Sequence, residues 1–222
     1  MGRTREAFFA AVAACLTFLV VPALASAAPV LTNPTGTVLA TGVTAVETNV
    51  GDVKFTTSLG TIICSTAVLK GPVATNSTAS GSKNEVTSAS FTGTGSGGDC
   101  TSWMGSVAVT SNPPTNGLPW CWESTAPTDE LRLRGGNCSS LSRPIQLTMD
   151  FTSPVLQCVY QRSAAQVGTV QTHVGGEVAG SKTMSQQEWT LLEGGGFCAS
   201  FFKLDAVFTL ETAGGSLIYT SS

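Results

Sequence analysis

The alternation of apolar and polar residues near the C-terminus most constrains the fold of this chain. Apart from Val207, apolar and polar residues alternate from Phe202 to Leu210, with Lys203, Asp205 and Thr209 between the apolar ones. A period of two residues places the apolar side chains on one face of an extended strand. The segment from Ile145 to Phe151 alternates in the same way. Both segments are therefore predicted to be half-buried antiparallel strands.

Short segments rich in Val, Thr, Ile and Phe recur along the rest of the chain, separated by Gly, Asn, Pro and Ser. This spacing is typical of an all-β domain, and no segment predicts a long helix. We expect an antiparallel β-sandwich, Ig-like or jelly-roll-like and stapled by disulfides, with a barrel as the alternative. The further predicted strands are Thr37–Glu47, Val53–Thr57, Thr61–Leu69, Glu85–Thr92, Ser106–Thr110, Leu118–Glu123, Glu130–Arg134, Val155–Gln161, Val167–Val174, Glu188–Leu192 and Ser216–Tyr219.

The composition excludes several classes of protein. The 222 residues carry a net charge of −3, which argues against a basic nucleic-acid binder. Only 11% of residues are charged and 42% are hydrophobic, so the chain is not a charge-rich disordered tail. Gly, Ser, Thr and Val are more prominent than the helix formers that a helical bundle needs.

The N-terminus has the layout of a secretory signal peptide. Arg3 and Arg5 precede an apolar run over residues 7–21, and Ala25-Ser26-Ala27 matches an A-x-A cleavage site. We predict a signal over residues 1–27 and a single domain over residues 28–222, with a possible subdomain break near residues 111–117. The run of about 15 residues is shorter than the roughly 20 that span a bilayer. The mature protein is therefore predicted to be secreted and to have no transmembrane segment. We also expect it to be a monomer.

A lipid anchor is the alternative localisation. Val12-Ala13-Ala14-Cys15 has the form of a bacterial lipobox, in which Cys15 would carry the lipid. The residues that follow Cys15 are still strongly apolar, whereas a lipidated cysteine is normally followed by a polar tether. Secretion is therefore the preferred prediction.

Six cysteines remain after the signal, an even number that indicates disulfides in an exported chain. Six cysteines allow 15 connectivities, and strand geometry favours local pairs. The predicted disulfides are Cys64–Cys100, Cys121–Cys138 and Cys158–Cys198. The chain has no C-x-x-C pair, and its only histidine, His173, lies far from every cysteine in sequence. No metal site and no cofactor are therefore predicted.

Motifs that carry enzyme chemistry are weak in this sequence. A catalytic serine would depend on His173 alone, and no G-x-S-x-G elbow occurs, so a serine hydrolase is rejected. The run Gly93–Gly98 fits G-x-G-x-x-G but is followed by Asp99 and Cys100 rather than by a helix, so we interpret it as a turn. No catalytic residue is predicted.

Two charged sets have a functional and an ordinary interpretation. Glycoside hydrolysis needs two carboxylates across a cleft, and Glu123, Asp129, Glu130 and Glu193 are the acids near aromatic residues. Arg132 and Arg134 share one face of a predicted strand and would be able to hold an anion. The ordinary interpretation of both sets is a solvated surface.

Trp120 and Trp122 are the residues singled out for ligand binding. They flank Cys121, so on a strand both indoles lie on one face and Cys121 lies on the other. Two such rings form either a flat platform for sugar rings or peptide, or ordinary core packing.

Several segments resemble a group of exported proteins of high-GC Gram-positive bacteria to which no activity is assigned. The resemblance consists of spaced Cys, Gly and aromatic positions over most of residues 30–222, and Cys121 and Cys138 look like an addition to it. It implies an exported, disulfide-stapled β domain and transfers no catalytic residue. The segments are Gly60–Cys64, Phe91–Cys100, Asn116–Trp120, Cys158–Tyr160, Phe208–Glu211 and Gly215–Tyr219.

Two function classes remain open from the sequence. The first is an exported non-catalytic domain with a binding or structural role at or outside the cell surface, whose partner is a glycan or a surface protein. The second is a secreted carbohydrate-active enzyme that uses paired carboxylates. The first is preferred because no residue set has the composition of a catalytic centre.

Overall fold

A computed structural model describes residues 30–111, 117–124, 130–140, 143–162, 170–172 and 181–221. These residues form an all-β protein in which every strand pairing is antiparallel, as the alternation predicted. The described elements are β1 (Val30–Thr32), β2 (Thr44–Asn49), β3 (Val53–Thr57), β4 (Gly60–Cys64), β5 (Thr66–Ser77), β6 (Gly81–Val86), β7 (Ser88–Thr92), a 3-10 helix (Ser96–Gly98), β8 (Cys100–Ser102), β9 (Gly105–Thr110), β10 (Trp120–Ser124), β11 (Glu130–Gly135), β12 (Ile145–Thr152), β13 (Val155–Arg162), β14 (Val170–Thr172), β15 (Ser181–Gly194), β16 (Phe201–Thr212) and β17 (Tyr219–Ser221).

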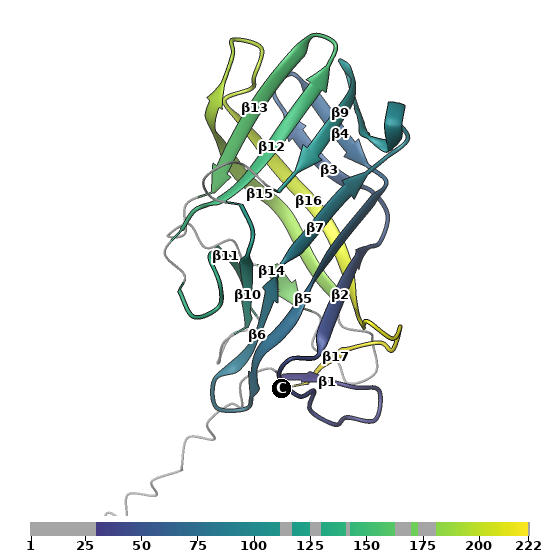
Figure 1. Cartoon of the computed structure of the whole chain (residues 1–222), viewed down its shortest axis with the longest axis vertical. Helices are drawn as coiled ribbons and strands as arrows, with labels where there is room; N and C mark the ends of the chain where they lie inside the picture. The colour runs from purple at the N-terminus through teal and green to yellow at the C-terminus, as the bar shows by residue number, and fades with distance from the viewer. Residues whose placement is uncertain are drawn as a thin grey trace, which may run out of the picture.

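Eight of these strands close an antiparallel barrel. Hydrogen-bonded pairing runs from β16 through β3, β4, β8, β9, β12, β13 and β15, and returns to β16. We call this circuit the upper ring, after its place in Figure 1. The expected sandwich is therefore wrong, and the alternative barrel is the observed architecture. A period of two residues is the same in an open and in a closed sheet, so the alternation does not distinguish them.

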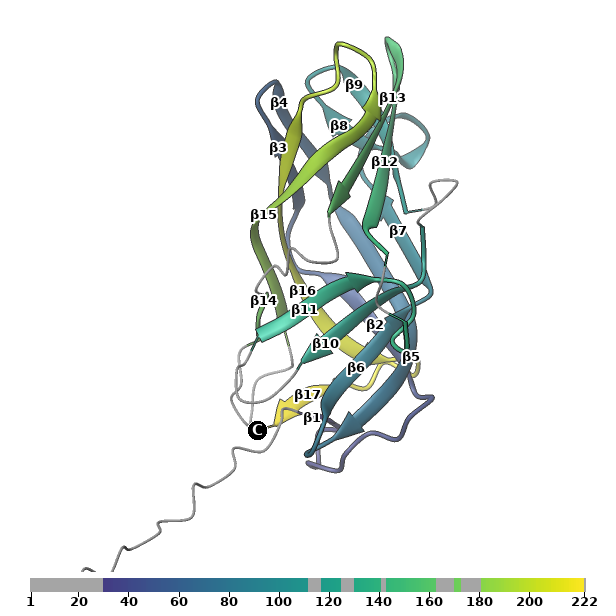
Figure 2. The ribbon, with the colours of Figure 1, turned by 90° about the vertical axis from the view of Figure 1, so that its left-hand side faces the viewer.

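The additional strands close a second circuit on the same two long strands. From β15 the pairing continues through β14, β11, β10, β6, β5 and β2 and returns to β16, which also makes eight strands. We call this circuit the lower ring (Figure 2). β15 and β16 have 14 and 12 residues, so each is long enough to pair in both rings. β7 adds to β5, and β1 pairs with β17 in a separate small sheet.

The change from one ring to the other explains where the predicted strands were inaccurate. The strand expected over Thr61–Leu69 is two strands, because β4 pairs with β3 in the upper ring and β5 pairs with β2 in the lower ring. The chain also passes between rings from β9 to β10, around the predicted subdomain break. A single apolar cluster contains residues of both rings, among them Met149 and Trp122.

The interior is filled by aromatic and aliphatic side chains. Phe202 is fully buried, and its ring lies 4.8 Å from Tyr160, 5.3 Å from Phe55 and 5.5 Å from Trp189, measured between centroids. The alternating residues of Phe202–Leu210 are buried as predicted. The upper ring is therefore packed with side chains, as expected for a barrel of eight strands.

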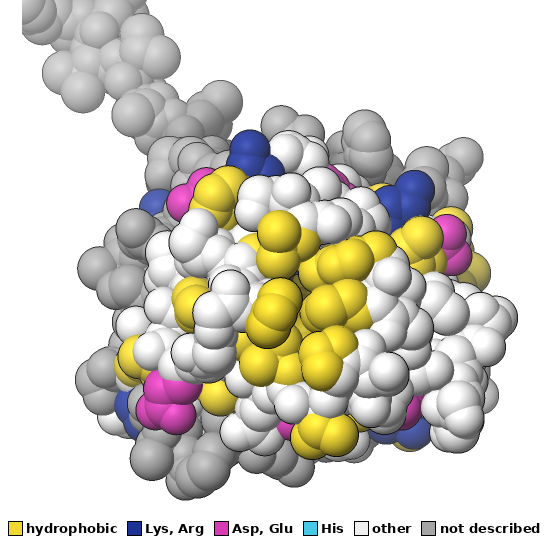
Figure 3. All heavy atoms as spheres, turned by 90° about the horizontal axis from the view of Figure 1, so that it is seen from above, with side chains coloured by type: hydrophobic (Ala, Val, Ile, Leu, Met, Phe, Trp, Pro, Cys, Tyr) yellow, Lys and Arg dark blue, Asp and Glu magenta, His cyan; other side chains and the backbone are white. Residues whose placement is uncertain are grey.

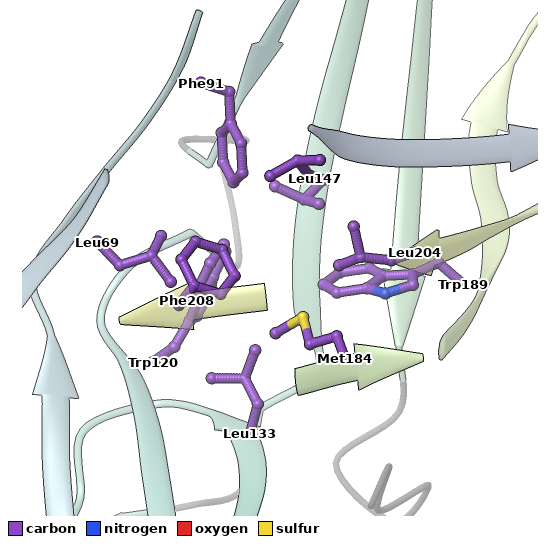
Figure 4. Close-up of a pocket in the computed structure, with 10 residues that line it drawn as sticks. Leu69, Phe91, Trp120, Leu133, Leu147, Met184, Trp189, Leu204 and Phe208 are labelled. Carbon is purple, nitrogen blue, oxygen red and sulfur yellow. The ribbon is translucent and has the colours of Figure 1, made fainter. Parts of the chain in front are cut away.

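A small apolar cavity remains between the packed side chains (Figure 4). Its volume is about 20 Å³, close to the space of one water molecule. A cavity of this size is too small for an organic ligand, and an apolar lining gives a water molecule no hydrogen bonds. The lining residues are Val53, Leu69, Phe91, Trp120, Leu133, Leu147, Met184, Trp189, Leu204 and Phe208.

Three disulfides fasten the strands, and they join the pairs predicted from the sequence. Cys64–Cys100 connects β4 with β8, Cys121–Cys138 connects β10 with the turn after β11, and Cys158–Cys198 connects β13 with the β15–β16 loop. Three disulfides in one domain are typical of an oxidising, extracytoplasmic environment. Among the residues that the structure describes, there is no helix of the length and hydropathy needed to cross a membrane.

Candidate functional site

The structure places the predicted platform residues inside the molecule. Trp120 and Trp122 lie on β10 between β6 and β11, and only 2% and 1% of their surfaces are exposed. The two indoles do share one face, but that face points into the core. Of the two interpretations of these residues, the structure therefore has core packing. Cys121 on the opposite face is also fully buried, so the alternation alone did not reveal which face is internal.

The acids considered for glycoside hydrolysis do not gather into a recognisable pair among the described side chains. Glu123 forms ion pairs with Lys83 at 3.0 Å and with Arg134 at 3.3 Å, and Glu193 is exposed in β15. Asp129 and the side chain of Glu130 lie outside the described residues. Arg134, considered for anion binding together with Arg132, is engaged by the Glu123 carboxylate.

The glycine run and the histidine add no site. Within residues 93–98 the amide of Gly93 donates to the carbonyl of Gly98 at 2.9 Å, and the amide of Gly95 donates to Asp99 at 2.8 Å. These amides are used by the turn itself, which agrees with its interpretation as a turn. His173 lies outside the described residues.

The upper end of the barrel carries a cluster of exposed apolar side chains that the sequence analysis did not identify. Each of four turns contributes one of them: Leu59 between β3 and β4, Trp103 between β8 and β9, Val155 at the start of β13, and Phe197 between β15 and β16. We call these four residues the tip surface. Figure 3 shows the apolar cluster from above, at the centre of that end of the molecule.

The exposure of the tip surface is unusual for side chains of this kind. Val155 is 93% exposed, Phe197 is 68%, Leu59 is 48% and Trp103 is 41%. The four turns, residues 57–60, 102–105, 152–155 and 194–200, contain no Asp, Glu, Lys, Arg or His. Contiguous exposed apolar surface with a polar surrounding is typical of an interaction site.

Local hydrogen bonds fix the first two turns of the tip surface. The hydroxyl of Thr57 accepts from the amides of Leu59 and Gly60 at 3.0 and 3.1 Å and donates to the carbonyl of Gly60 at 2.8 Å. In the next turn the hydroxyl of Ser102 accepts from the amide of Met104 at 3.1 Å. Such side-chain hydrogen bonds replace the ladder where the strand reverses.

Packing fixes Trp103, and a disulfide fixes the loop of Phe197. The indole of Trp103 covers Gly60, and its ring centroid lies 6.0 Å from that of Phe151. The Phe197 loop is closed by the neighbouring Cys198, which is bonded to Cys158 on β13. The turns that carry Leu59, Trp103 and Phe197 are therefore held in position before any partner binds, which lowers the entropic cost of binding.

A weak signal for this surface is present in the sequence. Each of the four turns contains at least one large apolar residue and no charge, whereas the turns elsewhere were identified only by Gly, Asn, Pro and Ser. The sequence does not show that these turns meet at one end, because that depends on the pairing of distant strands. Comparison with family models, with curated proteins and with solved structures finds no match to this chain.

Proposed function

We propose that this chain is an exported, non-catalytic β domain that binds a protein at the cell surface or outside the cell through the tip surface. The observation that carries the proposal is the meeting of four uncharged turns, each with a large exposed apolar residue, at one end of a rigid barrel. Burying such side chains against a partner releases about 25 cal/mol per Å² of apolar surface.

The chemistry of the tip surface favours a protein over a glycan or a bilayer. The argument for a glycan depended on Trp120 and Trp122, which are buried. Domains that bind a membrane surface usually add Lys and Arg beside the apolar side chains, and the four turns have neither. An apolar patch with aromatic residues is the composition of a protein-binding core. The three disulfides support the export that the signal predicts.

Co-sedimentation with isolated bacterial cell envelopes tests this function. The oxidised chain from Ala28 to Ser222 would be mixed with envelopes of a high-GC Gram-positive bacterium, before and after protease treatment of the envelopes. We expect pelleting that is lost in Val155→Ser/Phe197→Ser and on protease-treated envelopes. The matched control is Val38→Ser/Val50→Ser, which removes two exposed apolar side chains, 46% and 55% exposed, away from the tip surface.

The outcomes separate the possible partners. Pelleting that survives Val155→Ser/Phe197→Ser, or no pelleting at all, contradicts the proposal. Pelleting on protease-treated envelopes or on insoluble glycans indicates a carbohydrate partner instead. Binding to phosphatidylcholine vesicles that the double variant loses indicates that the tip surface enters a bilayer rather than a protein groove.

A further inference from the structure

Three polar side chains meet inside the lower ring, far from the tip surface. Glu47 on β2 is fully buried, and Lys182 on β15 and Asn84 on β6 are each 3% exposed. Charged side chains are rarely buried this completely. In the lower ring, β16 lies between β2 and β15, and β5 lies between β2 and β6. The three residues are therefore not on neighbouring strands, and only closure of the lower ring brings them together.

One carboxylate oxygen binds both nitrogens. Lys182 Nζ forms an ion pair with Glu47 Oε1, and Asn84 Nδ2 donates to the same Oε1 at 2.9 Å. Two hydrogen bonds to one atom place the lysine nitrogen within roughly 6 Å of the asparagine amide.

The surroundings of this cluster exclude water. Lys182 Nζ lies 4.6 Å from the centroid of the Trp122 ring, which covers it from one side. The strand neighbours of Glu47 are Leu69 and Leu210. Burial lowers the pKa of Lys182, and the nearby Glu47 carboxylate opposes this effect. Desolvation therefore favours the neutral amine, which is the nucleophilic form.

Two buried oxygens in the cluster have no hydrogen-bond partner among the described residues. They are Glu47 Oε2 and Asn84 Oδ1. An unpaired buried polar atom costs free energy, so two of them in one cluster need an explanation. A carboxyl group beside an amide is able to polarise it by donating a proton, and to accept a proton in turn.

We propose that Lys182 and Asn84 become joined by a covalent amide bond, with Glu47 as the catalytic acid and base. Lys182 Nζ forms a bond to Asn84 Cγ, and the bond from Cγ to Nδ2 breaks. Glu47 takes one proton from Nζ and delivers one to Nδ2, which leaves as ammonia. No oxidant or other reactant is needed, and the product ties β6 to β15 across the lower ring.

The mass of the intact protein tests this proposal directly. We expect the oxidised chain to be lighter by one ammonia than the sequence with three disulfides. After reduction and proteolysis, one peptide pair should contain Lys182 linked to Asn84. A mass equal to that calculated for the sequence with three disulfides and no loss of ammonia overturns the proposal. The measurement uses the wild-type protein, so it does not depend on the folding of a variant.

Variants then identify the reacting groups. Lys182→Met and Glu47→Gln should each abolish the loss of ammonia, the second because an amide in place of the carboxylate relays no proton. Asn84→Asp should give the same cross-linked product with loss of water instead. The matched control is Lys83→Met, which removes the neighbouring lysine that pairs with Glu123 and should retain the ammonia loss. A loss of ammonia that persists in Lys182→Met contradicts the proposal.

Discussion

Trp103 and Gly60 are in direct contact at the upper end of the barrel. A Cβ atom built on Gly60 would lie 2.8 Å from Cε3 of the Trp103 indole, closer than carbon atoms normally approach. The φ angle of Gly60 is +148°, a backbone conformation that residues other than glycine rarely adopt. This glycine therefore determines where the largest residue of the tip surface lies.

Gly60→Ala is expected to displace the Trp103 ring and to lower the free energy of unfolding by about 1–3 kcal/mol, the usual cost of overpacking. Tryptophan fluorescence and urea denaturation would measure the two effects. Gly196→Ala is the matched control, because no atom lies within 4 Å of a Cβ built there. Equal stability and fluorescence in the two variants would contradict the contact.

Trp122→Ala is expected to lower the free energy of unfolding by about 3–5 kcal/mol, the range for deleting a large buried side chain. The indole is 1% exposed and belongs to the main apolar cluster. Trp103→Ala should cost less because that ring is 41% exposed. Chemical denaturation of both variants measures the difference, and a Trp122 variant as stable as the parent would contradict its place in the core.

The stability of the protein is expected to fall at alkaline pH because of Tyr160. Burial raises the pKa of this phenol from 10.0 to about 12, and a hydrogen bond with the Ala199 backbone acts in the opposite direction. Between these two pH values the unfolded chain releases a proton that the folded chain retains. The contribution of Tyr160 is therefore complete below pH 10 and is lost as the pH rises towards 12.

Denaturation of the wild type and Tyr160→Phe across this window tests the prediction. The difference in the free energy of unfolding between the two proteins should be constant below pH 10 and should change between pH 10 and about 12. Phenylalanine has no phenolic proton, so its variant should show a shallower decline. Parallel curves through the whole window would show that Tyr160 titrates alike in both states.

The disulfides are expected to contribute unequally to stability. Cys121–Cys138 closes a separation of 17 residues and Cys158–Cys198 one of 40 residues. The chain-entropy model gives about 3 kcal/mol for the shorter loop and about 4 kcal/mol for the longer one. Paired Cys→Ala variants should follow this order in urea denaturation. The reverse order would indicate that native contacts, rather than loop length, set the contribution.

The sequence predicted local features well. The alternation of Phe202–Leu210 and Ile145–Phe151 predicted strands with one buried face, because a strand exposes alternate side chains whatever its partners are. The short separations of the cysteines favoured the three observed pairs. The sequence left Trp120 and Trp122 open between a platform and core packing, because the residues of one strand do not show which of its faces is internal.

The candidate site lay beyond sequence reasoning for a different reason. Leu59, Trp103, Val155 and Phe197 are each separated by about 40 residues or more along the chain, and nothing local indicates that their turns meet. The same holds for Glu47, Asn84 and Lys182, which lie in three strands far apart along the chain.

The sequence by itself predicted most of the strands and favoured the disulfide pairs that the structure has, because backbone geometry and short loops are local properties. The tertiary structure decided that β15 and β16 pair with each other and close two rings instead of two facing sheets. Closure depends on contacts between residues far apart in the chain, and only those contacts bury Trp122, expose Val155 and bring Lys182 to Glu47. The physical reason is that the residue pattern of a strand specifies which of its faces is apolar. The pairing of the strands at the edges of the sheet specifies which residues that face packs against.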